Sequence, residues 1–168
     1  MSVEVVEYDD AWPVRFTAEA DQIRAALGSE LRKIEHVGST SVPGLAAKPI
    51  VDMLVVVADS ADEGSYVPAL EAAGYTLRIR EPEWYQHRML KGAVEGRTVH
   101  LHVFSDGCEE ISRMLRFRDW LRTSDADRRL YERTKRELAQ REWKHMQNYA
   151  DAKTRVVEEI MGRARRSG

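Results

Sequence analysis

Small polar residues, one lysine and one aspartate are concentrated in residues 34–57, which read IEHVGSTSVPGLAAKPIVDMLVVV. A glycine lets a ligand approach the main chain, and consecutive backbone N–H groups can form a concave anion site. The candidate phosphate-binding residues of this stretch are Gly38, Ser39, Thr40, Ser41 and Lys48. A tight turn whose hydroxyls bond its own backbone would use the same residue types. A phosphate loop and a structural turn therefore both remain open, although the stretch matches neither a Walker loop nor a nucleophile elbow.

A single acid, Asp52, interrupts the apolar run that follows this loop. On a strand it shares its face with Leu54 and other apolar residues. An unpaired carboxylate inside a sheet is costly, so Asp52 should have a partner or bind a metal. The alternatives are an ion pair with Lys48 or Arg88, and a role in binding metal or substrate.

Two histidines, His100 and His102, are two residues apart in VHLHV and would point to the same face of a strand. Such a pair can bind a transition metal or contact phosphate. Surface histidines on an edge strand are the alternative. In the preceding predicted strand His87 and Arg88 are adjacent, so only one of them can face the same site.

Hydrophobic periodicity predicts the elements that must position these residues. Apolar residues three and four apart predict a helix over residues 12–28, and a second, short helix ends near Gly74. The five predicted strands span residues 31–38, 48–57, 75–81, 84–93 and 97–104, with a hairpin turn at Glu95-Gly96. Three further helices are predicted over residues 109–123, 123–140 and about 146–160. We expect one α+β domain over residues 1–168, with a mixed sheet in about 30–105 and helices in about 108–165.

Composition narrows the class of partner. The chain has 26 basic and 28 acidic residues and a net charge of -2, which gives no general attraction to nucleic acid or acidic membranes. The arginines near the end, such as Arg163, are expected in a frayed, soluble tail. One cysteine excludes an internal disulfide or a cysteine zinc cluster. No signal peptide or membrane span is recognisable, so we expect a cytoplasmic, soluble protein. Its oligomeric state stays open.

The segment EHVGSTSVPGLAAKPIVDMLV resembles the signature of the GrpB-like proteins, an uncharacterised family. Other matching pieces are YDDAW, AAGY, HLHVF, FRDWLR and YERTKRELA, so that the resemblance covers roughly residues 5–164. It implies a nucleotidyltransferase-like fold, in which helices cover a small mixed sheet. In that superfamily a Gly-Ser turn after the first strand grips nucleotide phosphates, and an Asp-x-Asp/Glu pair on the next strand holds divalent metal.

The match to this metal site is partial. Gly38-Ser39 corresponds to the turn and Asp52 to the first acid, whereas Leu54 stands at the position of the second acid. A third acid of the superfamily follows on a later strand, where this chain has histidines.

The resemblance therefore implies a divalent cation, Mg²⁺, Mn²⁺ or Zn²⁺, held by Asp52, His100 and His102. One carboxylate and two imidazoles favour manganese, zinc or iron over magnesium, which prefers oxygen ligands. Arg88 and Lys135 are candidates to meet phosphate charge. Lysines on the C-terminal helices, including Lys153, would ordinarily be solvated.

Two functions follow from the resemblance. The first is metal-assisted transfer of a nucleotidyl group from a nucleoside triphosphate to an unknown small acceptor, with Asp52 as the catalytic residue. The second is a non-catalytic or accessory module that binds a nucleotide or a phosphorylated metabolite, which the missing second acid favours. Some family members are fused to dephospho-CoA kinase, in keeping with an accessory role. A metal-dependent hydrolase is a third class.

Overall fold

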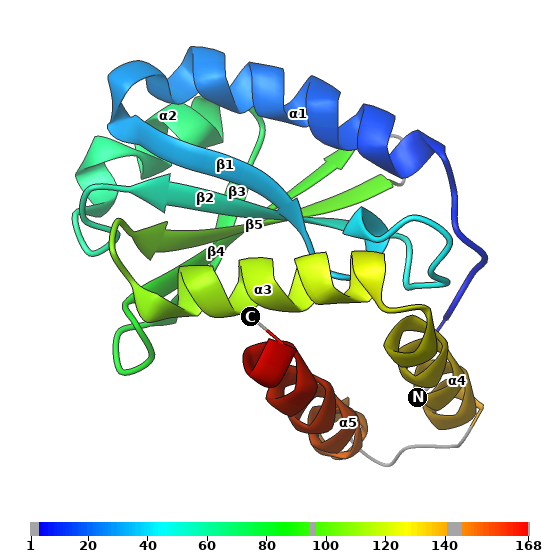
Figure 1. Ribbon diagram of the computed structural model, residues 1–168. Coiled ribbons are helices and arrows are strands. Elements are labelled where there is room, and N and C mark those ends of the chain that lie inside the picture. The colour runs from blue at the N-terminus through cyan, green and yellow to red at the C-terminus, as the bar shows by residue number, and fades with distance from the viewer. Residues whose placement is uncertain (1–3, 95–96, 141–145, 168) are drawn as a thin grey trace.

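The computed structural model describes residues 4–94, 97–140 and 146–167 of the chain (Figure 1). Within these residues five strands form one mixed sheet, and helices cover both of its faces. The strands are β1 (Leu31–Val37), β2 (Ile50–Val57), β3 (Thr76–Glu81), β4 (His87–Val94) and β5 (Arg97–Ser105). The helices are α1 (Ala11–Leu27), α2 (Val67–Ala72), α3 (Glu109–Thr123), α4 (Asp125–Ala139) and α5 (Met146–Ser167). The predicted α+β class and strand number are confirmed, and the predicted turn at Glu95-Gly96 lies outside the described residues.

The strands are arranged in the spatial order β1-β2-β5-β4-β3. Strands β2 and β5 are parallel, and every other neighbouring pair is antiparallel. The chain leaves β2, crosses through α2, and returns through β3 and β4 to place β5 beside β2. His100 and His102 therefore lie on a central strand, which excludes the edge-strand alternative for this pair.

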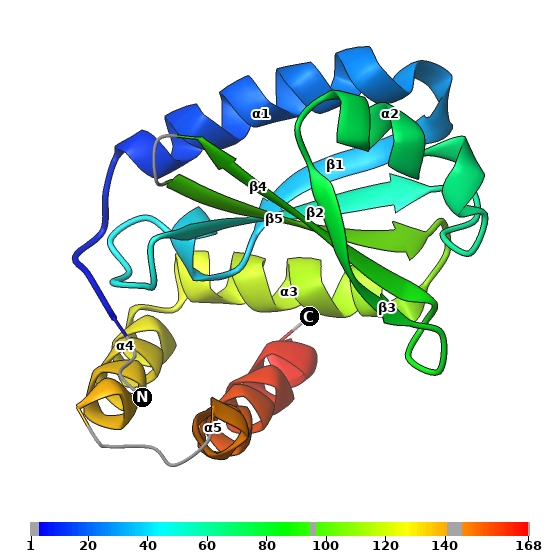
Figure 2. The same cartoon turned by 180° about the vertical axis from the view of Figure 1, so that it is seen from behind.

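Each face of the sheet is covered by a different set of helices (Figures 1 and 2). Helices α1 and α2 lie on one face, where Met53, Val55 and Leu101 belong to the main hydrophobic core. Helix α3 lies on the other face, against the second apolar cluster that contains Leu54 and Phe104. Strand β2 is apolar on both sides because both of its faces are covered.

The C-terminal helices pack on the loop between β1 and β2. Val42 and Leu45 of that loop are fully buried in a third cluster with residues of α3, α4 and α5. Burying one such side chain contributes about 1.5–3 kcal/mol. Polar contacts add to the docking: the Arg122 Nε donates to the Ser41 carbonyl at 3.0 Å, and the Ala46 N–H donates to the Glu132 carboxylate at 2.7 Å. Helices α4 and α5 are thereby held over residues 38–48.

Two local predictions need correction. Strand β4 begins at His87, because Tyr85 and Gln86 adopt φ of 55° and 51° and reverse the chain after β3. Both left-handed residues lie in the connection between Glu81 and His87, the last paired residues of β3 and β4. At the C-terminus Arg163 is not in a frayed tail: its Nε donates to the buried Asp127 carboxylate at 2.8 Å.

No helix in the described part of the chain combines the length and apolar character needed to cross a membrane.

Candidate functional site

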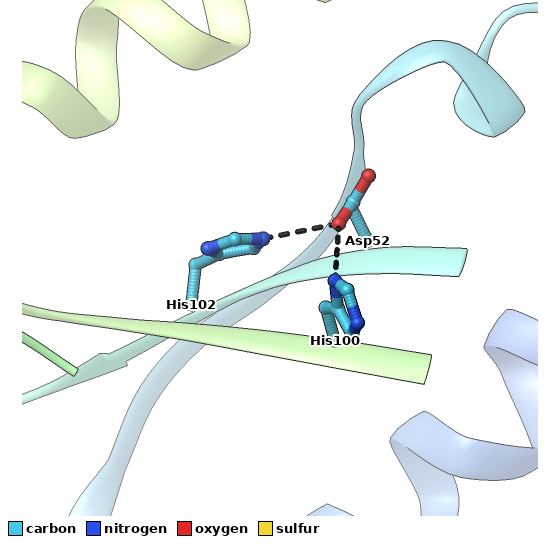
Figure 3. Close-up of side chains that lie close together, drawn as sticks. All are labelled: Asp52, His100 and His102. Carbon is cyan, nitrogen blue, oxygen red and sulfur yellow. Dashed lines mark hydrogen bonds and ion pairs between the residues drawn. The ribbon is translucent and has the colours of Figure 1, made fainter. Parts of the chain in front are cut away.

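Asp52 and the two histidines meet on the α3 face of the sheet (Figure 3). In the parallel pairing of β2 with β5, Asp52 is opposite His100, and Leu54 is opposite His102. The Asp52 Oδ1 lies 3.0 Å from His102 Nε2 and 3.8 Å from His100 Nδ1. The partner that an acid in a sheet requires is therefore supplied by the neighbouring strand.

Gly38 brings the end of β1 against this carboxylate. It follows Val37, which is paired with Asp52 across the antiparallel strands. Gly38 has φ of +74°, and a Cβ at this position would lie 2.7 Å from Asp52 Oδ2. Any other residue would have to adopt an unfavourable backbone conformation and displace the carboxylate. The glycine therefore allows the loop to pass directly over Asp52.

Thr40 and Ser41 hold the loop and do not line the pocket. Thr40 Oγ1 donates to the Ile50 carbonyl at 3.1 Å, so it accepts the bond from His36 Nε2 at 2.9 Å. Ser41 Oγ donates to the Gly38 carbonyl. Both residues are buried, and their hydroxyls bond the protein itself, as in the structural turn considered above. Of the three hydroxyl residues, Ser39 is the one that reaches the pocket.

His36 belongs to the support of this loop. Its ring stacks on Phe16 of α1, with the centroids 5.1 Å apart. Burial is the largest influence on its pKa, which falls to about 4. The ring is therefore neutral at pH 7, with its proton on Nε2, and it acts as a fixed donor to Thr40.

Beside Asp52 the surface is hollowed into a pocket of about 240 Å³. Its walls come from the β1–β2 loop, β2, β5, α4 and α5. The lining residues are Ser39, Lys48, Ile50, Asp52, His100, Lys135 and Lys153.

Lys135 is the most buried cation of the pocket, with 3% of its surface exposed. Its Nζ donates to Ser39 Oγ at 2.7 Å and lies 5.1 Å from the centroid of the Tyr131 ring. Burial, followed by the charge of Lys153, lowers the pKa of Lys135 to about 7, while Asp52 opposes the change. Burial also lowers the pKa values of Lys48 and Lys153. An anion in this pocket would favour the charged form of all three lysines.

Lys153 is a pocket residue that the sequence interpretation missed. It was expected to be solvated, but it lines the pocket from α5. The sequence did contain a pattern that indicates this position. Lys153 lies on the same helical stripe as Val156 and Ile160, which are buried. Lys135 likewise lies between Tyr131 and Leu138 on the buried side of α4. A lysine within an apolar stripe is therefore the pattern that identifies both.

The structure does not bring Arg88 to the pocket. Its Nε donates to Glu63 Oε2 at 2.7 Å, and Glu63 also accepts a bond from Arg80. These two bonds lower the pKa of Glu63 to about 2. Because side chains alternate along β4, Arg88 points to the α2 side and its neighbour His87 points to the side of Asp52.

Sequence comparison places the chain in a known family: the profile described as GrpB protein matches residues 2–163. The chain belongs to the GrpB family. Among its relatives, the UPF0157 protein BH1888 of Halalkalibacterium halodurans is 60% identical over 163 residues, which cover 97% of this chain and 83% of that protein. The crystal structure of the conserved protein GrpB from Enterococcus faecalis matches with a TM-score of 0.81 and 34% identity, covering 95% of this chain and 98% of that one.

A further relative of this GrpB protein is longer. A dephospho-CoA kinase of Mycolicibacterium paratuberculosis is 32% identical over 164 residues, which cover 83% of this chain and 40% of the kinase. The similarity therefore concerns one part of that protein. The resemblance to the GrpB-like proteins seen in the sequence is confirmed, and the sheet and helices agree with the fold that it implied.

The donor atoms of this GrpB chain fit a divalent transition metal. One ligand atom each from Asp52, His100 and His102 can be chosen so that all lie within 4.8 Å of one another. Two imidazole nitrogens and one carboxylate oxygen suit manganese, zinc or iron, whereas magnesium prefers a set of oxygens. Leu54 is fully buried in the apolar cluster beneath α3, so that the position of the second acid offers no ligand.

Proposed function

We propose that this GrpB protein binds the phosphates of a nucleoside triphosphate in the lysine pocket and transfers the nucleotidyl group to a small acceptor. One observation carries the proposal: three lysines and the Ser39 hydroxyl converge on a single pocket beside Asp52 and His100. Among the described lining residues, three lysines with depressed pKa values share the pocket with one carboxylate, Asp52, which favours an anion of more than one negative charge.

Ser39 and the lysines would take the phosphates. A lysine and a phosphate oxygen about 4 Å apart attract by about 4 kcal/mol at an effective dielectric constant of 20, before the cost of desolvation. Lys135, already bonded to Ser39, is held in place and would lose little side-chain entropy when the anion binds. Lys48 and Lys153 approach the same space from the loop and from α5.

Asp52, His100 and His102 would hold a divalent cation next to the phosphates. In phosphoryl and nucleotidyl transfer such a cation would neutralise the negative charge that develops on the phosphate oxygens. The protein's own part is to place the α-phosphate between this triad and the lysines. Gly38 supports that placement because the loop can lie against Asp52 without a side chain between them.

A second candidate is a module that binds the nucleotide or a phosphorylated metabolite without turnover. The observation that favours it is the full burial of Leu54, which leaves one carboxylate where the superfamily resemblance implies two. The lysine pocket would serve either function, because both functions require phosphate groups to bind there. The two candidates differ in whether the α-phosphate is transferred.

The test is an incubation of the purified protein with α-labelled nucleoside triphosphates, Mn²⁺ or Zn²⁺, and a mixture of small hydroxyl- and amine-containing acceptors. The wild type should release pyrophosphate and label an acceptor, and Asp52→Asn should lower this rate at least 100-fold. Asp106→Asn, at an exposed aspartate just after β5, is the matched control and should retain the wild-type rate. Saturable binding without product would favour the module, and no binding of any triphosphate would refute the transferase and leave only a module for another phosphorylated metabolite.

A further inference from the structure

A chain of side-chain hydrogen bonds leads from Asp52 across the sheet to its surface. His102 Nε2 lies 3.0 Å from Asp52 Oδ1, and His102 Nδ1 lies 3.1 Å from His87 Nε2. His87 Nδ1 lies 2.6 Å from Glu81 Oε1. The four side chains come from the successive strands β2, β5, β4 and β3. Glu81 and His87 have no role in the phosphate site described above.

The ring of His87 is held tightly in this chain. It is 5% exposed and stacks on His102 with centroids 5.3 Å apart and an interplanar angle of 16°. Trp84 and Phe104 contact it at centroid distances of 5.2 Å and 4.9 Å. Glu81 is paired with His87 in the β3–β4 ladder, and its side chain is 45% exposed. Packing thus fixes which atoms of the two rings face each other.

Glu81 and Asp52 are the two ends of this chain, and with both rings neutral only one of the two carboxylates can receive a ring proton. A carboxylate only accepts, so Glu81 requires the proton of His87 on Nδ1. In a neutral His87 ring Nε2 is then an acceptor, and it must receive a proton from His102 Nδ1. A neutral His102 with its proton on Nδ1 turns the lone pair of Nε2 toward Asp52, which also only accepts, so this end of the chain is satisfied when a cation lies between the two atoms. That nitrogen is the one available to a cation at the triad.

We propose that Glu81 and His87 are positioning residues that orient the proton of His102 so that its Nε2 can bind a cation beside Asp52. The inference rests on the proposed function for the presence of that cation. Metal-binding histidines generally donate their other N–H to a fixed acceptor, and losing that acceptor typically costs 10–100-fold in metal affinity. Here the acceptor is a second histidine, which is itself oriented by a carboxylate.

Replacing Glu81 by glutamine allows the direction of donation to reverse along the hydrogen bonds that lead from residue 81 to Asp52. A glutamine amide can accept from His87 Nδ1 or donate to it, and when it donates, the His87 proton lies on Nε2 and faces His102 Nδ1. His102 then carries its proton on Nε2, where Asp52 accepts it, and all bonds are satisfied with both rings neutral. The nitrogen needed by the cation is blocked in this arrangement. A simple structural ion pair between Glu81 and His87 would predict no such change at His102.

The experiment compares wild type, Glu81→Gln and the control Glu83→Gln, which makes the same charge change at an exposed residue of the same turn. Isothermal titration with Zn²⁺ alone, and with Mn²⁺ alone, should give 10–100-fold weaker binding for Glu81→Gln and unchanged binding for Glu83→Gln. Nitrogen-15 NMR of the histidine rings, without and with zinc, should locate the proton of each ring. Thermal unfolding checks that all three proteins are folded.

The outcomes separate the two hypotheses. Weaker zinc binding by Glu81→Gln, with the His87 proton moved from Nδ1 to Nε2, supports the inference. Equal zinc affinity and unchanged tautomers in Glu81→Gln overturn it. If the wild type binds neither metal, the cation of the proposed function is refuted, and the metal-free spectra still decide whether Glu81 controls the protonated nitrogen of His102.

Discussion

Replacing Lys135 by methionine should stabilise the protein at pH 6. The reason is that Lys135 is 3% exposed and its pKa is depressed from 10.5 to about 7. At about 1.36 kcal/mol per pKa unit, keeping this buried amine charged costs about 5 kcal/mol. Methionine loses the bond to Ser39 and the contact with the Tyr131 ring, worth about 1 kcal/mol each. We therefore expect a net gain of about 2–3 kcal/mol in the free energy of unfolding.

The gain should depend on pH in a defined direction. Below pH 7 Lys135 is protonated in both states, and the full cost of its burial applies. Between pH 7 and 10.5 the folded state has lost this proton while the unfolded state retains it, so the cost falls steadily. By about pH 9.5 the remaining cost is about 1.4 kcal/mol, and the two lost contacts offset it.

Urea denaturation at pH 6, 8 and 9.5 measures this dependence. Lys33→Met is the matched control, since Lys33 is exposed on β1, and its effect should stay within about 0.5 kcal/mol. The reasoning is refuted if Lys135→Met is less stable than wild type at pH 6, or if its gain is the same at every pH. A stabilised variant that also fails to bind a polyphosphate would mark Lys135 as a residue whose burial serves binding.

Three further predictions follow from the same contacts. Gly38→Ala should destabilise the protein by about 2 kcal/mol in urea denaturation, because its Cβ would meet Asp52 and its φ is +74°; an unchanged midpoint would contradict the close approach. Pyrophosphate affinity, measured by isothermal titration, should fall from pH 6 to pH 8 as Lys135 loses its proton, and Lys135→Met should show a weaker dependence. Glu63→Gln should cost about 2 kcal/mol at pH 7, because it removes the partner of the buried Arg88. The pKa of Glu63 is about 2, so this stabilisation is present above pH 4.5 and lost toward pH 2; thermal unfolding at pH 7 and pH 2 should show an effect only at the higher pH.

Local patterns in the sequence were sufficient for the elements and for part of the site. Alternation along residues 97–104 predicted that His100 and His102 share a face, and the run around Asp52 predicted a strand on which Asp52 shares its face with Leu54. Both predictions hold because side-chain direction in a strand repeats every two residues. Gly38 was predicted to let a ligand approach the main chain, and the structure places the Asp52 carboxylate against it.

The partners of these residues could not be predicted from local patterns. The hydroxyls of Thr40 and Ser41 looked suited to phosphate, but they donate to the main-chain carbonyls of Ile50 and Gly38. From the sequence, Arg88 and His87 were equally good candidates to face the site of Asp52. The folded sheet places His87 on the side of Asp52 and Arg88 on the opposite side. Such choices depend on which groups the folded chain brings within hydrogen-bonding distance.

The sequence by itself determined the residue types of the site and the face on which each strand presents them. Tertiary structure decided that β5 lies beside β2, which places His100 opposite Asp52, and that α4 and α5 bring Lys135 and Lys153 over the loop. The bond between Lys135 and Ser39 joins residues 96 positions apart. Periodicity acts over a few residues, whereas strand order and helix docking depend on burying apolar surface contributed by the whole chain.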